Sequence, residues 1–264
     1  MQGVAEIFHV IIKLKKEPAK PLPRKGSTVL KYTCIFFDID NCLMDTPTSE
    51  RRTIKALYAQ QGQIVGDEVT ETYRRINKEL WVHLDAGEIT RKELEVMRFR
   101  ELFKIYPFFK TPEEVSPWFL DRWATAIDPM PGADHLLQRL TDAGVRVYTA
   151  SNGIGKTMNG RVAGAGLDKW VTGAFSADEI GFMKPAYEYF DYIFRESGET
   201  DKHKALFVGD NPVTDVDGAL DYGMDACLLG WRYTENPRAT YSVPTMKALE
   251  DILFDGSERT EEKK

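Results

Sequence analysis

The sequence has few cysteines and no dense disulfide pattern. Its 264 residues contain three, Cys34, Cys42 and Cys227. They are odd in number, widely spaced and form no C-x-x-C pair, which excludes a disulfide-stapled secreted scaffold. This usage is typical of a reducing compartment, and we expect a cytoplasmic protein.

Long apolar runs and an excess of positive charge are also missing. A membrane-spanning helix needs about 20 apolar residues, and the strand-like stretch 34–37 is far too short. The formal net charge is −6, whereas a surface that binds nucleic acid or anionic lipid needs clustered Lys and Arg. We therefore expect no membrane and no nucleic acid partner, and an anionic substrate has to be bound by a few local groups.

The sequence contains enough hydrophobic residues to form a sizeable core. With 42% hydrophobic residues, the chain suits one domain with an insertion or two modest domains. Residues 15–26 combine five Lys or Arg residues with three prolines, a composition that resists packing. The preceding apolar stretch 4–14 carries Glu6 and lacks a basic flank, so it is a poor signal peptide. We expect residues 1–30 to form a disordered extension.

From Tyr32 onward, strand-like and helix-like segments alternate along the chain. Such alternation predicts a Rossmann-like α/β core, a parallel sheet with helices on both faces. Strands are expected over residues 32–38, 145–150, 174–176, 205–208 and 226–229, and helices over 133–143, 155–165, 186–196, 213–222 and 245–254.

One stretch departs from the alternation and reads as helices only. Between residues 47 and 128, apolar residues recur at helical spacing, as at Ile54, Leu57 and Tyr58. Both edges carry helix breakers, and two chain crossings at such edges can act as a hinge. We therefore predict a core formed by residues 31–46 and 129–264, with residues 47–128 inserted as an all-α, mobile cap domain.

Four short polar segments follow predicted strands, where a parallel sheet places its ligands. The first contains Asp38 and Asp40, two carboxylates two residues apart that leave the strand on the same side. A phosphoryl transfer needs an in-line nucleophile, a metal and an acid for the leaving oxygen, and paired aspartates meet these needs. Alone, the pair is equally typical of a turn.

The next two segments offer groups that bind phosphate. Ser151 and Asn152 end a strand and open a helix, where a hydroxyl and backbone N–H groups can receive phosphate oxygens. Lys184 supplies a cation ahead of another helix and can shield the repulsion between phosphate and aspartates. Taken singly, the first is typical of a helix cap and the second of a solvated surface lysine.

The fourth segment places Asp210 and Asp215 beyond a buried strand, and such oxygen ligands suit Mg²⁺. The order of acid pair, hydroxyl, lysine and acid pair on successive strands is more specific than any single segment. In this order the chain resembles the haloacid dehalogenase superfamily of phosphatases, over residues 32–253. The matching motifs are Asp38-x-Asp40, Ser151, Lys184 and Gly209-Asp210-x-x-x-x-Asp215.

The resemblance implies a role for each matched residue. Asp38 would be the nucleophile and a Mg²⁺ ligand, Asp40 the general acid and base whose backbone carbonyl also meets the metal, and Asp210 a further ligand. Ser151, Asn152 and Lys184 would bind the phosphate. Asp215 would orient Lys184 or a metal-bound water, although the neighbouring Asp217 competes for this role.

Two positions distinguish this chain within the superfamily. Cys42 stands where the family's first motif usually has Thr, so the contact that the Thr hydroxyl makes in the family is in doubt here. The Cys42 thiol either packs in the core or makes the site sensitive to oxidation. Asp40 is the second carboxylate that the dehalogenase branch lacks, and its presence implies a phosphatase or phosphotransferase.

The predicted cap narrows the resemblance to the bacterial pyrimidine 5′-nucleotidases. The segments Asn77-Lys78-Glu79-Leu80-Trp81 and Gly87-Glu88-Ile89-Thr90 look like the N-K-x-L-W and G-x-I-T patterns of that subfamily. Lys78 and Trp81 are therefore candidate substrate contacts. An aromatic residue in an apolar helical stripe is more often core, and a lone Lys is more often solvated.

The sequence thus predicts a Mg²⁺-dependent phosphomonoesterase with an aspartyl-phosphate intermediate, acting on nucleoside 5′-monophosphates with a preference for pyrimidines. A sugar-phosphate or phosphoglycolate phosphatase of the same superfamily is the alternative. A non-catalytic phosphate-binding regulator is a third hypothesis, because fold alone does not establish activity. We expect a small-molecule substrate and a monomer or homodimer.

Overall fold

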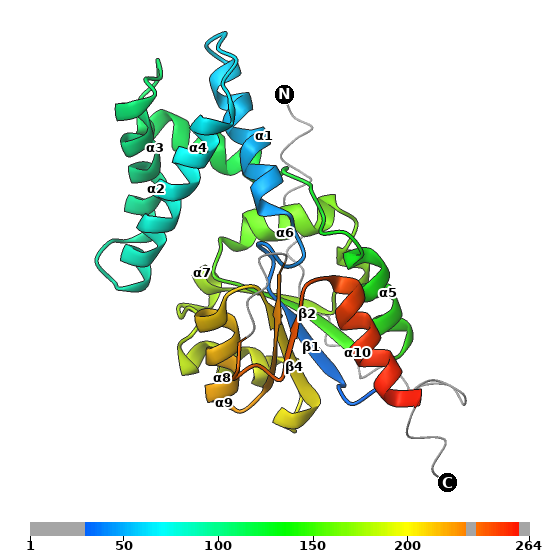
Figure 1. Cartoon of the computed structure of the whole chain (residues 1–264). Coiled ribbons are helices and arrows are strands. Elements are labelled where there is room, and N and C mark those ends of the chain that lie inside the picture. The colour runs from blue at the N-terminus through cyan, green and yellow to red at the C-terminus, as the bar shows by residue number, and fades with distance from the viewer. Residues whose placement is uncertain (1–29, 231–235, 259–264) are drawn as a thin grey trace, which may run out of the picture. The chain divides into compact units, whose positions relative to one another are not determined.

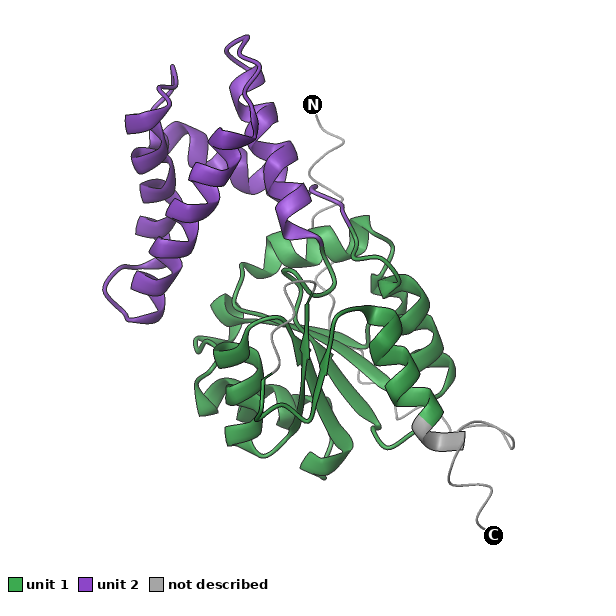
Figure 2. Ribbon diagram, viewed as in Figure 1, with its two compact units in different colours: residues 1–44, 129–264 green, residues 45–128 purple. Residues whose placement is uncertain are grey.

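A computed structural model describes residues 30–230 and 236–258 (Figure 1). The chain divides into two compact units, one formed by the residues up to Met44 and those from Pro129, the other by Asp45–Asp128 (Figure 2). Of the predicted extension, residues 1–29 lie outside the described residues, and Leu30 is buried. No helix in the described ranges combines the length and hydrophobicity that crossing a bilayer requires.

The first unit is built on a six-stranded sheet in which every paired strand is parallel, with the order β3-β2-β1-β4-β5-β6. The predicted fold class is confirmed. The strands are β1 (Cys34–Phe37), β2 (Arg146–Ser151), β3 (Gly173–Ser176), β4 (Ala205–Gly209), β5 (Asp225–Leu229) and β6 (Tyr241–Val243). The edge strand β6 is the one that the sequence analysis missed.

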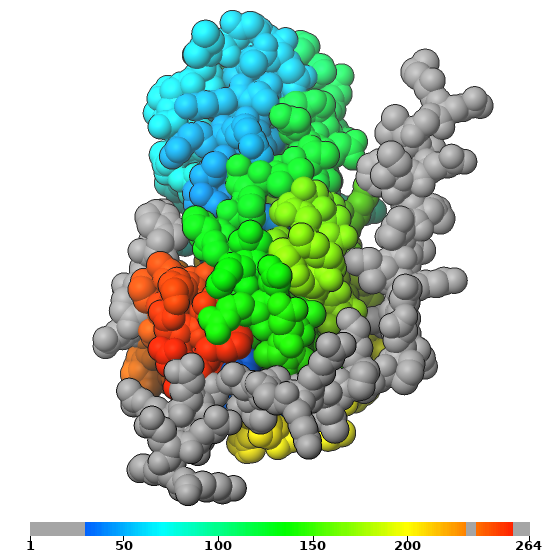
Figure 3. All heavy atoms as spheres, turned by 90° about the vertical axis from the view of Figure 1, so that its right-hand side faces the viewer, coloured from blue at the N-terminus to red at the C-terminus, as the bar shows by residue number. Residues whose placement is uncertain are grey.

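Helices cover both faces of this sheet. They are α5 (Ala133–Asp142), α6 (Gly155–Gly164), α7 (Ala177–Ile180), α8 (Tyr187–Ser197), α9 (Gly218–Tyr222) and α10 (Met246–Glu258), with a π-helical segment η4 (Pro212–Asp217) before α9. Helices α5 and α10 lie side by side on one face (Figures 1 and 3), and α8 and α9 cover the other (Figure 1).

Strands β1 and β4 at the centre of the sheet contain no polar side chain, because both of their faces are buried. All four residues of β1 are inaccessible to solvent. On the face toward α8, Phe36 stacks on Tyr148 of β2 with 5.3 Å between ring centroids, and Phe207 of β4 packs edge to face on Phe190 of α8 at 5.4 Å. Each such aromatic contact adds about 1 kcal/mol to the burial of its area.

The second unit consists of four helices, α1 (Thr46–Ala59), α2 (Asp67–Asp85), α3 (Arg91–Ile105) and α4 (Pro112–Trp123). Helices α3 and α4 begin with capping boxes at Thr90 and Thr111, which bond the free N–H groups of the first turns. Tyr73, Phe99 and Phe119 form its aromatic core, with ring centroids 5.1–5.9 Å apart.

The topology of the sheet decides where the polar segments meet. Phe37 at the end of β1 lies opposite Thr149 of β2 and Val208 of β4, so the carboxyl ends of the three strands lie at the same edge of the sheet. The chain leaves β1 toward β2 and returns on the other side of β1 as β4, which makes the carboxyl end of β1 a switch point of the winding order. Open α/β sheets bind their ligands at such points.

Candidate active site

Asp38 is the first residue after β1 and points into this switch point. Its backbone N–H donates to the carbonyl of Val208 at 2.8 Å, which continues the pairing with β4. Its side chain is buried and accepts a hydrogen bond of 2.6 Å from Nζ of Lys184 at Oδ1. Burial raises the pKa of Asp38 well above its usual value; Lys184 opposes this, and Asp215 and Asp210 add to it.

Lys184 is the cation at the centre of the site. Its backbone N–H donates to Oδ1 of Asn152 at 2.8 Å, and Nδ2 of Asn152 donates to its carbonyl at 3.0 Å, so the amide clamps the segment that carries the lysine. Nζ pairs with Asp215 at 2.7 Å as well as with Asp38. Burial lowers the pKa of this ammonium, but the two carboxylates outweigh that effect and raise it, so Lys184 stays charged.

Asp215 reaches the site from η4. Its Oδ2 accepts the backbone N–H of Asn211 at 3.0 Å, and a Cβ atom on Gly209 would lie 2.2 Å from the same oxygen. Only glycine allows the chain to pass this close to the carboxylate. Asp217, the competing carboxylate in the sequence, instead pairs with Arg238 at 2.7 Å.

Asp210 immediately follows β4 and faces the turn that carries Asn41. Nδ2 of Asn41 donates to its Oδ2 at 3.1 Å. Burial raises the pKa of Asp210 to about 7, and the charge of Asp215 adds to the effect while the bond from Asn41 reduces it. Asn41 adopts a left-handed backbone conformation with φ of 57°, which an Asn tolerates better than most residues.

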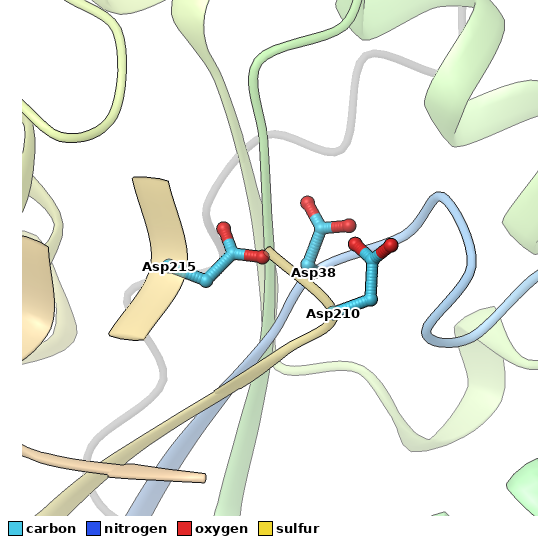
Figure 4. Close-up of side chains that lie close together, drawn as sticks. All are labelled: Asp38, Asp210 and Asp215. Carbon is cyan, nitrogen blue, oxygen red and sulfur yellow. The ribbon is translucent and has the colours of Figure 1, made fainter. Parts of the chain in front are cut away.

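The carboxylates of Asp38, Asp210 and Asp215 converge, with one oxygen of each within 4.8 Å of the others (Figure 4). One lysine faces three acids here, and the neighbouring aspartates add to the effect of burial, which is the main cause of the raised pKa of Asp38 and Asp210. A hard divalent cation with oxygen ligands relieves this repulsion. The donor set of these three carboxylates therefore fits Mg²⁺.

Ser151 and Asn152 lie at the end of β2, beside the lysine. Oγ of Ser151 accepts the backbone N–H of Gly153 at 2.9 Å, which leaves the hydroxyl proton to donate. Helix α6 starts three residues later. The structure thus brings together residues from the ends of β1, β2 and β4 and from the loop after α7, namely Asp38, Ser151, Asn152, Asp210, Asp215 and Lys184.

Asp40 stands apart from the lysine cluster and pairs with a residue that the sequence analysis missed. Its Oδ1 lies 2.5 Å from Nη1 of Arg161, a fully buried side chain on α6. Arg161 shares a helix face with buried Met158 and Val162. An arginine at an apolar position of a helical pattern is the signal that would have found it.

Cys42 closes the turn after β1. Its Sγ donates to the carbonyl of Val208 at 3.6 Å, and burial raises the pKa of the thiol, so it stays protonated. The thiol therefore bonds a backbone oxygen of β4.

Lys78 and Trp81 both lie on α2 of the helical unit. Lys78 is exposed, and Trp81 is half-buried with the guanidinium of Arg91 5.2 Å from its ring. Trp81 thus stands outside the fully buried aromatic core of that unit.

Comparisons with known proteins match most of this chain. A family model described as a haloacid dehalogenase-like hydrolase matches residues 32–223. The chain is 28% identical over 229 residues to the HAD-hydrolase YfnB of Bacillus subtilis, covering 84% of this chain and 96% of that protein. It is 27% identical to the pyrimidine 5′-nucleotidase YjjG of Escherichia coli over 229 residues, covering 85% and 99%.

A solved structure of YfnB bound to magnesium superimposes with a TM-score of 0.78 at 26% identity, covering 84% of this chain and 99% of that one. The alignment of the two structures therefore includes residues of both compact units.

Proposed function

The chain belongs to the haloacid dehalogenase-like hydrolase family, and from this premise we propose that it is a Mg²⁺-dependent phosphatase whose nucleophile is Asp38. The observation that carries the proposal is the acid pair after β1. Asp38 is bound to Lys184, whereas Asp40 lies partly open to solvent with 36% of its side chain exposed. In this proposal Asp38 attacks and Asp40 exchanges protons.

The charges around Asp38 suit a phosphoryl group once a metal is present. Mg²⁺ would be held by Asp38, Asp210 and the backbone carbonyl of Asp40, and when bound it supplies positive charge to the phosphoryl oxygens. Lys184 adds a fixed cation, and the hydroxyl of Ser151 and the amide of Asn152 add hydrogen-bond donors. These groups bind the phosphate and shield it from the aspartates.

In the proposed reaction the phosphoryl group is transferred twice. A carboxylate oxygen of Asp38 forms a bond to phosphorus while the bond from phosphorus to the ester oxygen breaks, and Asp40 donates its proton to that oxygen. Asp40 then takes a proton from water, whose oxygen attacks phosphorus. The bond to Asp38 breaks, which releases inorganic phosphate and restores the carboxylate.

For the substrate, we propose nucleoside 5′-monophosphates with a pyrimidine base. YjjG, 27% identical over most of its length, is named a pyrimidine 5′-nucleotidase. Of the two segments that resemble that subfamily, residues 77–81 lie on α2 and residues 87–90 lie between α2 and α3. Because the groups around Asp38 meet only the phosphoryl end, discrimination between bases needs further contacts. Lys78 and Trp81 are our candidates, being exposed and half-buried on α2.

The test is Mg²⁺-dependent release of phosphate from p-nitrophenyl phosphate, followed by a panel of metabolite monophosphates. We expect UMP and dTMP to give the highest kcat/KM. A sugar phosphate or phosphoglycolate at the top of the panel would replace the nucleotidase proposal and keep the phosphatase. Absence of turnover on every phosphomonoester, with Mg²⁺ present, would favour a non-catalytic phosphate-binding regulator.

A further inference from the structure

Arg161 is a charged side chain placed where α6 needs an apolar one. It is 0% exposed and lies on the face that buries Thr157, Met158 and Val162. A guanidinium stays charged in proteins and is costly to bury, so such a position persists only with a compensating partner. Here that partner includes Asp40, whose Oδ1 lies 2.5 Å from Nη1.

The helix that carries Arg161 is firmly docked at its first turn. The backbone N–H of Gly155 donates to Oδ1 of Asp178 at 2.9 Å, and a Cβ atom on Gly155 would lie 2.6 Å from Oγ of Ser176. The glycine thus brings α6 into close contact with the end of β3. Arg161 therefore projects from a rigid element that begins directly after the segment of Ser151 and Asn152.

The backbone of Asp40 is also fixed. It forms a bridge with Met44, whose N–H donates to the carbonyl of Ile39 at 2.8 Å. With the turn set by these bonds, the side-chain torsions decide where the carboxylate points. The ion pair with Arg161 restrains those torsions on a side chain that is otherwise 36% exposed.

We propose that Arg161 is a positioning residue, which holds the Asp40 carboxylate in the orientation from which it exchanges a proton with the ester oxygen. The inference rests on the proposed function, because it assigns Asp40 the proton transfer. Misplacement of a reacting group by about 1 Å can cost roughly 10²-fold in rate. A positioning role thus predicts a loss in kcat, with little change in KM.

The experiment compares Arg161→Gln, Arg161→Lys, Asp40→Asn and the double variant Asp40→Asn/Arg161→Gln. Each is assayed with Mg²⁺ on p-nitrophenyl phosphate and on UMP, or on the nucleoside monophosphate that ranks first in the panel. An aryl leaving group needs little protonation, whereas an alkyl one depends on it. We expect Arg161→Gln to lower kcat on UMP by about 10- to 100-fold, and on p-nitrophenyl phosphate far less.

Two further results follow from positioning alone. In the double variant, loss of Arg161 should cost nothing beyond the loss caused by Asp40→Asn, because the group that it orients is gone. Arg161→Lys should recover part of kcat and keeps a cation in the buried position, so it stays measurable if the Gln variant folds poorly. The matched control is Arg139→Gln, which breaks a 2.6 Å pair with buried Glu250 and should show no preference between leaving groups.

The outcomes distinguish a failure of the proposed role of Arg161 from a failure of the proposed phosphatase function. If wild type turns over phosphomonoesters and Arg161→Gln loses activity equally on both substrates, or adds its loss to that of Asp40→Asn, Arg161 has a structural role and the inference is wrong. If wild type turns over no phosphomonoester at all, the proposed function fails and the inference fails with it.

Discussion

Nζ of Lys184 lies 2.6 Å from Oδ1 of Asp38, and both side chains are almost completely buried. The same ammonium pairs with Asp215 at 2.7 Å. This lysine is therefore a central structural charge of the site as well as a candidate phosphate ligand.

Removing that charge should damage both stability and activity. Lys184→Met leaves two buried carboxylates without their cation, and breaking a buried ion pair from one side costs about 3–5 kcal/mol. Urea unfolding measures the loss. The control Lys31→Met removes an exposed pair with Asp225, 2.5 Å long, and should cost at most about 1 kcal/mol. An active Lys184→Met protein with near-normal stability would contradict the assigned role.

The raised pKa of Asp210, about 7, predicts a pH dependence of stability in metal-free protein. The unfolded carboxyl titrates near its ordinary value of about 4, so between about pH 4 and 7 the folded state binds more protons. Stability contributed by this group therefore falls as pH rises through that window. In EDTA, the free energy of unfolding of Asp210→Asn minus that of wild type should increase as the pH rises through this window. A flat difference would show that Asp210 titrates normally.

Mg²⁺ should bind where the acids converge and stabilise the folded state by mass action. We expect it to raise the Tm of wild type at pH 7 and to raise that of Asp210→Asn much less. EDTA should abolish turnover, and added Mg²⁺ should restore it. An equal rise in Tm for both proteins would place the metal elsewhere.

The close approach of Gly209 to Asp215 allows a test of whether the site depends on the absence of a side chain at position 209. Gly209→Ala places a methyl group 2.2 Å from Oδ2 of Asp215, so the carboxylate that pairs with Lys184 has to shift. We expect kcat/KM to fall at least about tenfold and the protein to be destabilised by about 1–3 kcal/mol. Gly230→Ala, where the added Cβ meets nothing within 4 Å, should stay within about 0.5 kcal/mol of wild type.

Variants of α2 test the proposed base recognition. Lys78→Ala and Trp81→Ala should lower kcat/KM for UMP more than for p-nitrophenyl phosphate, because the small aryl ester has no nucleoside to recognise. Lys78 is exposed, so its loss should leave Tm unchanged. For Trp81→Ala, equal losses on both substrates together with a lower Tm would make the ring part of the packing of the helical unit.

Much of the fold could be predicted from the spacing of apolar residues in the sequence. Buried parallel strands are continuous apolar runs, and the helices that cover them have one apolar face. The edge strand β6 (Tyr241–Val243) was missed because it is three residues long and pairs only with β5. Helix 213–222 was predicted as one element, but it begins as the π-helical segment Pro212–Asp217, which a helical period does not reveal.

The site residues were found because they follow strands in order along the chain. Arg161 was missed for the opposite reason, since its partner Asp40 lies 121 positions away and on a different element. The bond from Asn41 to Asp210 likewise depends on β1 and β4 being neighbours. Such pairs are set by tertiary packing, which local spacing does not encode.

The central claim, a phosphoryl ester on Asp38, is tested most directly by trapping it. During turnover with Mg²⁺ the protein is quenched, the acyl phosphate is reduced with borohydride, and peptides are mapped by mass spectrometry. We expect homoserine in place of Asp38 only when substrate is present, and none in Asp38→Asn, which should be inactive once reversion by deamidation is excluded. Unmodified Asp38 with reduction at another carboxylate, or full turnover by Asp38→Asn, would contradict the mechanism.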